Sequence, residues 1–270
     1  MKNRIFTAVF IITAVTIVFM FSCKTAATAK DEPAAIIAET SAGLTTEQEY
    51  YFGRAVSANI LSAYKVWNGN TQLTNYLNLI CGAVAINSPR PNIYNGYRVA
   101  ILDTNEVNAF STSAGHIFLT RGLVNAIKSE DALAALLAHE IAHIQLKHSI
   151  TQVLLEIESP NNYELAAIFN EAAAETATMI AARGYSTEQE FESDIFALNL
   201  MAYAGYNPKS YLDMLRDLYT AQSRSRGGLN NTHPAPDHRQ ANIETLIESF
   251  DMPDTRVHRQ IRFGSAVMAR

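Results

Sequence analysis

Residues 129–150 have the sequence SEDALAALLAHEIAHIQLKHSI, and this stretch predicts one long helix. Ser129 is a preferred N-cap residue, and Glu130 and Asp131 in the first turn interact favourably with the helix dipole. No Gly or Pro interrupts the sequence that follows, so we expect the helix to extend to about Ile150. The polar side chains within it therefore lie at fixed angles to one another.

Two histidines within this helix have the spacing of metal ligands. His139 and His143 are four residues apart, which places their side chains one turn apart and about 40° from each other around the helix. Two imidazoles placed in this way can bind one tetrahedral Zn²⁺. Glu140 lies between them and points beside the metal, where it can take a proton from a zinc-bound water whose pKa has fallen toward ~7.

A hydrolytic zinc site needs a third protein ligand and one open position. His148 is the nearest candidate in sequence, but in a continuous helix it would be rotated by about 140° from His143. We therefore expect His148 to be a surface residue. Glu190 and Asp194 fit better, because they are four residues apart on one face of a helix that begins with the capping box Ser186–Gln189. One carboxylate can bind zinc while the other accepts the ring N–H of a ligating histidine.

Other acidic residues near these positions have simpler interpretations. Glu192 points away from both Glu190 and Asp194, so we expect it to be solvated. Glu171 and Glu175 form another pair at a spacing of four, and a solvated helix face is the preferred interpretation of that pair.

The rest of the chain predicts a mainly helical α+β protein with one small sheet. Three short β-patterns, one of which includes residues 107–110, precede the long helices, and a capping box at Thr46–Glu49 predicts that a helix follows it to about Tyr64. Helices are expected at residues 46–64, 71–85, 129–150, 163–183, 187–204, 208–222 and 237–250, and strands at residues 97–103, 107–110 and 116–120. We expect a small, antiparallel-containing sheet packed on the helical core that contains residues 129–150.

The N-terminus predicts export from the cytoplasm. Lys2 and Arg4 precede an uncharged run from Ile5 to Phe21, which is short for a membrane span and typical of a secretory signal. Cys23 follows in a context similar to a bacterial lipobox, and we expect it to be lipidated; an uncleaved anchor or an ordinary cleaved signal are the alternatives. The predicted organisation is a signal peptide at 1–22, a tether at 23–44, one domain at 45–250 and a tail at 251–270.

Composition excludes several classes of protein. The chain has 270 residues, is 48% hydrophobic, and has a net charge of −5 with no basic run, which argues against a nucleic-acid partner. Its two cysteines cannot form a disulfide framework, and we expect Cys81 to be buried and unreactive.

Together these motifs resemble a known family, the zinc metallopeptidases of the CAAX prenyl-protease and HtpX type, and in particular its short bacterial lipoprotein members. The resemblance covers about residues 45–250. Besides the two motifs above, the matching stretches are Tyr50–Arg54, Val107–Phe110, Gly115–Gly122, Gly205–Pro208, Thr232–Pro234 and Arg239.

The resemblance implies roles for individual residues. It implies one Zn²⁺ per chain held by His139, His143 and Glu190, with Glu140 as the general base and Asp194 supporting a ligand. It places His233, Arg239 and Asn108 beside the transition state or the metal. His233 could instead bind zinc as a fourth ligand that blocks the site, and surface positions for His233 and Arg239 remain alternatives.

The expected function is an endopeptidase that cleaves protein substrates outside the cytoplasm. A short edge strand that includes Asn108, Ala109 and Phe110 could pair with an extended peptide; an internal strand is the alternative. The N-terminal pattern predicts a lipid-anchored enzyme, and Lys24 directly after Cys23 favours the periplasmic side of an outer membrane. The resemblance implies that the enzyme removes misfolded envelope proteins. The alternatives are an envelope chaperone or scaffold with a blocked zinc site, and a zinc amidase that acts on cell-wall peptides.

Overall fold

The computed structural model describes residues 44–150, 162–222, 232–233, 236–253 and 256–268. The predictions for the signal peptide, for lipidation of Cys23, and for all but the last residue of the tether fall outside these residues. No helix among them is long and apolar enough to cross a membrane.

The protein is mainly helical with one small sheet, as predicted. Three strands form a mixed sheet in the order β1-β3-β2, in which β1 and β3 are parallel and β2 and β3 antiparallel. The strands are β1 (Arg98–Leu102), β2 (Ala109–Ser111) and β3 (His116–Thr120). The helices are α2 (Thr46–Ala63), α3 (Thr71–Ala85), α4 (Arg121–Ala126), α5 (Glu130–Gln145), α7 (Asn162–Ala182), α8 (Thr187–Tyr203), α9 (Ser210–Gln222), α11 (Pro236–Glu248) and α12 (Arg256–Met268).

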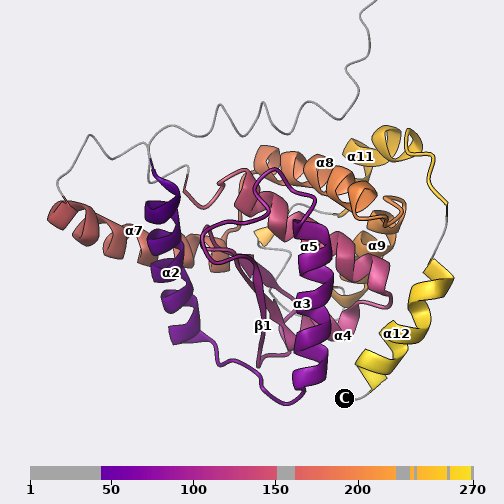
Figure 1. Cartoon of the computed structure of the whole chain (residues 1–270), viewed down its shortest axis with the longest axis horizontal. Coiled ribbons are helices and arrows are strands. Elements are labelled where there is room, and N and C mark those ends of the chain that lie inside the picture. Colours follow the sequence, from indigo (N-terminus) through magenta and orange to yellow (C-terminus); the bar gives the residue numbers. More distant parts are fainter. Residues whose placement is uncertain (1–43, 151–161, 223–231, 234–235, 254–255, 269–270) are drawn as a thin grey trace, which may run out of the picture.

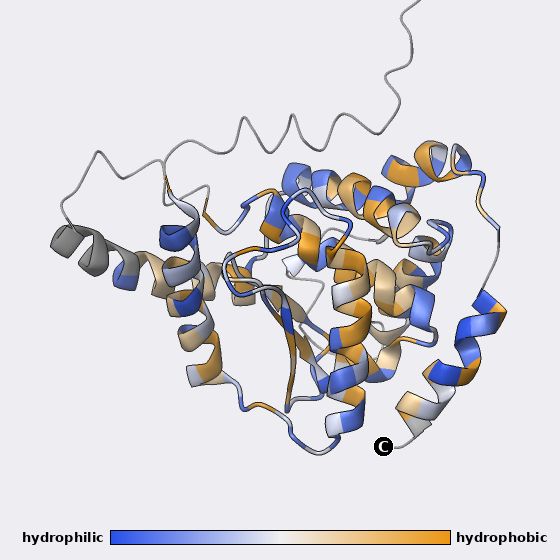
Figure 2. Ribbon diagram, in the orientation of Figure 1, coloured by the Kyte–Doolittle hydropathy of each residue, from blue (hydrophilic) through white to orange (hydrophobic). Residues whose placement is uncertain are grey.

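Helix α5 lies at the centre of the fold, and all of its residues are buried. It packs against α8, α3 and α9, and it also contacts β2 (Figure 1). The hydropathy colouring shows an apolar α5 covered by helices that are polar on their outer faces (Figure 2). Polar side chains on α5 are therefore buried, and each needs a partner.

The capping signals predicted at Ser129 and Ser186 are confirmed. Ser129 Oγ accepts from the backbone N–H of Ala132 at 3.1 Å, and the capping box at Ser186 is complete. The box predicted at Thr46–Glu49 lies one residue earlier, because Thr45 is the N-cap and Gln48 completes the box. Cys81 is a buried free thiol, and burial raises its pKa to about 12. Its predicted burial is therefore confirmed.

Helix α5 ends earlier than predicted. Gln145 is its last residue, and Lys147 adopts the left-handed conformation with φ 59°. The backbone N–H of His148 then donates to the carbonyl of His143 at 3.1 Å. This is the hydrogen bond of a Schellman motif, in which the chain turns back over the last helical turn. The prediction of a continuous helix to Ile150 is wrong because no Gly marks this turn.

Two helices were not predicted from the sequence. Helix α4 is one short segment after β3, and α12 follows residue 250, where only a tail was expected. Arg259 of α12 pairs with Asp131 at 2.8 Å, and Arg262 pairs with Glu130. Helix α12 is thereby attached to the first turn of α5.

Candidate metal centre

Helices α5 and α8 bring two imidazoles and one carboxylate to a common point. The Nε2 atoms of His139 and His143 are 3.1 Å apart. Glu190 on α8 places Oε2 3.4 Å from Nε2 of His139 and Oε1 3.5 Å from Nε2 of His143. The predicted third ligand therefore faces both histidines from a separate helix.

His233 completes the cluster from the chain segment before α11. Its Nδ1 lies 2.6 Å from Oε2 of Glu190, and one donor atom from each of the four residues lies within 4.8 Å of the others. Glu190 Oε1 is buried and has no hydrogen-bond partner among the described residues. A buried carboxylate oxygen without a partner is costly unless a cation contacts it. The donor set of imidazole nitrogens and one carboxylate suits zinc, so these residues fit the ion.

The electrostatics of the cluster keep its carboxylate ionised. Burial would raise the pKa of Glu190, but His233, His139 and His143 outweigh burial and hold that pKa well below its usual value. Burial lowers the pKa of His143 well below its usual value, which favours the neutral imidazole that a metal requires. The charged Glu190 and the neutral His143 are both in the form that binds a metal. Burial and Arg239 would lower the pKa of His139, but hydrogen bonds with Asp194 and Glu190 raise it to about 9, so His139 must lose a proton to bind a metal.

Asp194 supports His139 from the side of the ring away from Glu190. Its Oδ1 lies 3.0 Å from Nδ1 of His139 and accepts from the hydroxyl of Tyr211 at 2.6 Å. Burial would raise the pKa of Asp194, but Arg239 and His139 lower it to about 2. Asp194 is therefore an ionised acceptor that favours a hydrogen on Nδ1 of His139 and leaves Nε2 free to bind.

Arg239 lies behind His139. It donates to Oδ2 of Asp194 at 3.0 Å and to Oδ1 at 2.6 Å, and its Nη2 is 3.3 Å from Nδ1 of His139. Its side chain is 2% exposed. The resemblance implies a place for Arg239 beside the transition state or the metal; these contacts bind it to Asp194, and its Nη1 also lies 4.0 Å from Oε2 of Glu190.

His148 is not the surface residue predicted from its spacing. It is buried, and its Nδ1 lies 2.9 Å from Nδ1 of His143. The prediction is wrong because the turn at Lys147 reverses the chain before His148. Glu192 is half exposed, as predicted, and Glu171 and Glu175 are exposed.

Glu140 shares a small gap with the edge strand of the sheet. The gap is lined by Glu140, Ala109, Phe110, Ser111, Ile180, Gly184, Tyr185, Thr232 and His233. Strand β2 is at the edge, as the order of strands shows. Asn108 is fully buried, and its Oδ1 accepts from the hydroxyl of Thr232 at 3.2 Å, so this side chain holds the segment that carries His233.

The chain matches the model of peptidase family M48 over residues 71–247. It belongs to peptidase family M48. The matched region contains His139, Glu140, His143 and Glu190, and helices α2 and α12 lie outside it.

The individual relatives of this M48 chain have low sequence identity to it over the matched regions. It is 28% identical over 159 residues to mitochondrial metalloendopeptidase OMA1 of Schizosaccharomyces pombe, covering 57% of this chain and 46% of that protein. It is 25% identical over 225 residues to the beta-barrel assembly-enhancing protease of Escherichia coli K12, covering 75% of this chain and 45% of that protein. The chain spans less than half the length of these relatives. Family and relatives together support a metallopeptidase.

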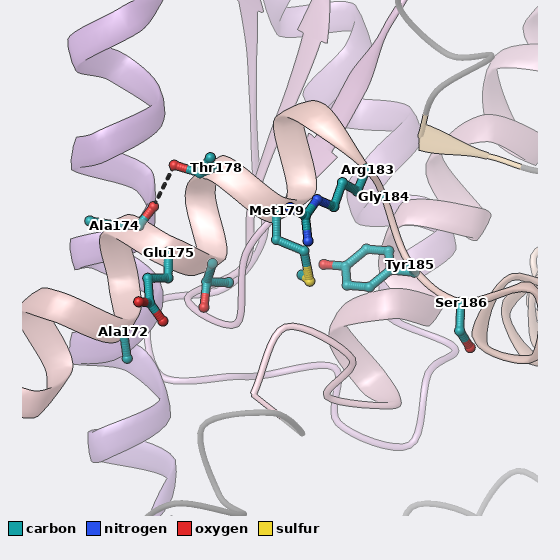
Figure 3. Close-up of a pocket in the computed structure, with 10 residues that line it drawn as sticks. Ala172, Ala174, Glu175, Thr178, Met179, Arg183, Gly184, Tyr185 and Ser186 are labelled. Carbon is teal, nitrogen blue, oxygen red and sulfur yellow. Dashed lines mark hydrogen bonds between the residues drawn. The ribbon is translucent and has the colours of Figure 1, made fainter.

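A larger groove borders the M48 site on the side of α7. Its volume is about 760 Å³, and it is lined by Ala172, Ala174, Glu175, Thr176, Thr178, Met179, Arg183, Gly184, Tyr185 and Ser186. Figure 3 shows Met179 and Arg183 beside the Tyr185 ring. That ring stacks on His143, with centroids 4.3 Å apart and planes 21° apart. Tyr185 therefore separates the groove from the cluster of four ligands.

Sequence reasoning missed two aromatic residues at this site. Tyr211 comes from α9, and Tyr185 comes from the connection between α7 and α8. Neither belongs to a spacing motif with the histidines that it contacts, since Tyr211 is 72 residues from His139. Only the tertiary structure brings them together.

Proposed function

We propose that the protein is a zinc-dependent endopeptidase. The observation that carries this proposal is the convergence of His139, His143 and Glu190 on one point, with an orphaned Glu190 oxygen and with Glu140 in the adjoining gap. Zinc, when bound, supplies a Lewis acid that polarises the scissile carbonyl and acidifies water. The remaining chemistry belongs to side chains of this protein.

Glu140 is the general base of the proposed reaction. Its carboxylate takes a proton from the attacking water and passes it to the nitrogen of the leaving amine. Asp194 keeps the hydrogen of His139 on Nδ1, and Arg239 holds Asp194 in place. We infer that Arg239 is a positioning residue, because its donors contact Asp194, Tyr211 and His139 and its side chain is buried.

The substrate would be an extended polypeptide. Strand β2 is an edge strand with Ala109 and Phe110 in the gap beside Glu140, which suits main-chain pairing with a peptide. The groove along α7 ends at Tyr185, next to the same gap, and would take the side chains on one side of the scissile bond. Its lining combines Ala, Thr and Met with the charged side chains of Glu175 and Arg183, so it would take both small apolar and charged side chains.

The cellular setting is also a proposal. The signal and lipobox patterns support a lipid-anchored enzyme on the periplasmic side of a bacterial outer membrane, similar to the short lipoprotein members of the CAAX prenyl-protease and HtpX type. One relative is named for enhancing beta-barrel assembly. By analogy, substrates of this chain would be misfolded envelope proteins.

A single substitution tests the mechanism. Glu140→Gln removes the base and leaves the ligands, so it should retain one zinc per chain by elemental analysis and lose about 10²-fold to 10⁴-fold of casein cleavage. Glu244→Gln on the exposed face of α11 is the matched control and should cleave casein normally. Cleavage by Glu140→Gln at the wild-type rate would refute the proposed role.

A binding protein with a blocked site is the second candidate function. The contact of 2.6 Å between His233 and Glu190 favours it, because His233 would then hold the metal together with His139, His143 and Glu190. The His233→Ala variant separates the two functions. Casein cleavage by wild-type protein or by His233→Ala supports the peptidase, whereas no cleavage by either zinc-loaded protein supports the binding protein.

A further inference from the structure

The second histidine of the motif has an unusual partner. Nδ1 of His143 faces Nδ1 of His148 at 2.9 Å, and both rings are buried. Nε2 of His148 lies 3.4 Å from Oε2 of Glu192, whose side chain is half exposed. A chain of three side chains therefore runs from the candidate metal site to the surface of α8.

The turn after α5 places His148 in this position. Lys147 is left-handed, and the N–H of His148 bonds to the carbonyl of His143, so His148 lies back over the last turn of the helix. The Lys147 ammonium also pairs with the buried carboxylate of Glu49 on α2. The left-handed conformation is unfavourable for lysine, so this turn is held by its surroundings rather than by its own preference.

The geometry determines which nitrogens carry hydrogen. Two ring nitrogens that face each other at hydrogen-bond distance share one hydrogen, because one must donate and the other accept. Nε2 of His143 points at the shared point of the cluster and needs its lone pair there, so its hydrogen is on Nδ1. His148 then accepts at Nδ1, and its own hydrogen is on Nε2, directed at Glu192.

His139 and His143 are thus held in different ways. His139 has a carboxylate at its Nδ1, that of Asp194, whereas the ring nitrogen of His148 occupies the corresponding place beside His143. We propose that His148 is a positioning residue that fixes the tautomer and ring orientation of His143 for metal binding, and that Glu192 orients His148. This inference rests on the proposed zinc site.

The first test measures zinc affinity by competition with a chelator. His148→Leu removes the acceptor and should weaken zinc binding by about 10-fold to 100-fold, as expected when the hydrogen-bond partner of a metal ligand is lost. His148→Gln offers a carbonyl acceptor and should recover part of that loss. His258→Leu, at an exposed histidine of α12, is the control and should bind zinc as the wild type does. Wild-type affinity in His148→Leu would overturn the proposal.

The second test needs no variant and covers the case in which His148→Leu does not fold. Nitrogen-15 NMR of the imidazoles in wild-type protein, with and without zinc, should find the hydrogen of His148 on Nε2. A hydrogen on Nδ1 of His148 in the zinc-loaded protein would overturn the inference. If wild-type protein binds no zinc, the proposed function fails, whereas zinc binding with the hydrogen on Nδ1 of His148 overturns this inference alone.

Discussion

At the scale of single residues, the Asp194 carboxylate is the most heavily hydrogen-bonded group of the site. Tyr211 and Arg239 both donate to it, and Nδ1 of His139 lies 3.0 Å from it. All four side chains are buried. Since a buried charge is tolerated only when it is paired, Asp194 and Arg239 depend on each other.

Removing Arg239 should therefore affect folding before catalysis. Arg239→Met leaves a buried carboxylate without its cation and should lower the free energy of unfolding by about 3–5 kcal/mol, measured in urea. Arg216→Met is the control, because the side chain of Arg216 is 68% exposed and its pair with Asp213 should contribute less than about 1 kcal/mol. An Arg239→Met protein of normal stability that has lost only kcat/KM would instead place Arg239 on the substrate.

The sequence predicted those site residues whose spacing is local. His139, Glu140 and His143 share one helical turn, and Glu190 and Asp194 share another, so helical geometry alone places each group on one face. His148 was predicted wrongly because a left-handed lysine ended the helix without a glycine signal. Tyr185 and Tyr211 could not be predicted, because their contacts with the histidines are tertiary.

At the scale of elements, the turn between α7 and α8 supports the segment that carries His233. Gly184 has φ +70°, and a Cβ atom there would lie 1.7 Å from the carbonyl oxygen of Thr232. Any side chain at this position must push the 232–233 segment away. The fit of this turn therefore helps to hold His233 against Glu190.

Two glycine-to-alanine substitutions measure how closely the 232–233 segment packs against Gly184. Gly205→Ala, with φ +78° and no atom near the added carbon, should cost only the conformational penalty of roughly 1–2 kcal/mol. Gly184→Ala should lower the free energy of unfolding in urea by clearly more than Gly205→Ala, because the clash with Thr232 adds to the same conformational penalty. An equal decrease in the free energy of unfolding in the two variants would mean that the 232–233 segment does not pack tightly against Gly184.

Glu130 is one of the two buried carboxylates that attach helix α12. Burial would raise the pKa of Glu130, but hydrogen bonds from Arg262, Tyr76 and Tyr206 outweigh burial and lower it. A carboxylate whose folded pKa is lowered contributes stability above its unfolded pKa of about 4.3, and that stability is lost as the pH falls through the folded value.

The Glu130→Gln variant tests this contribution through its pH dependence. Its free energy of unfolding should be lower than that of the wild type at neutral pH, and the difference should shrink as the pH falls below about 4. Glu244→Gln is the control and should follow the wild-type curve. A difference that does not change with pH would show that the charge of Glu130 is not what attaches α12.

Helices were predicted where capping residues and apolar periodicity occur together. Helix α12 shows why the remaining helices were missed. Its sequence is amphipathic, but the apolar face is not the one that packs on the core, since Val257 and Ile261 are exposed whereas Phe263 is buried. Its attachment depends on Arg259 and Arg262, which read as ordinary surface residues in the sequence. Ion pairs between distant helices leave no periodic signal.

At the scale of the whole molecule, the candidate metal site joins α5, α8 and the 232–233 segment. A ligand that binds only the folded chain stabilises it by about 4 kcal/mol when present at about 1,000 times its Kd. Zinc should therefore raise Tm, EDTA should lower it, and Glu190→Ala should respond to neither. Glu188→Ala, at an exposed residue of the same helix, is the control and should respond as the wild type does. An unchanged zinc response in Glu190→Ala would exclude Glu190 as a ligand.

The two ends of α5 are secured by helices that the family match leaves out. Glu49 of α2 holds the turn at Lys147, and Arg262 of α12 holds Glu130 at the opposite end. A recombinant fragment trimmed to residues 71–247 would lack both ion pairs, because Glu49 and Arg262 lie outside it. Such a fragment would retain every proposed zinc ligand in its sequence, but each end of α5 would have lost one of the ion pairs that hold it, so we expect the fragment to be less stable than the intact protein.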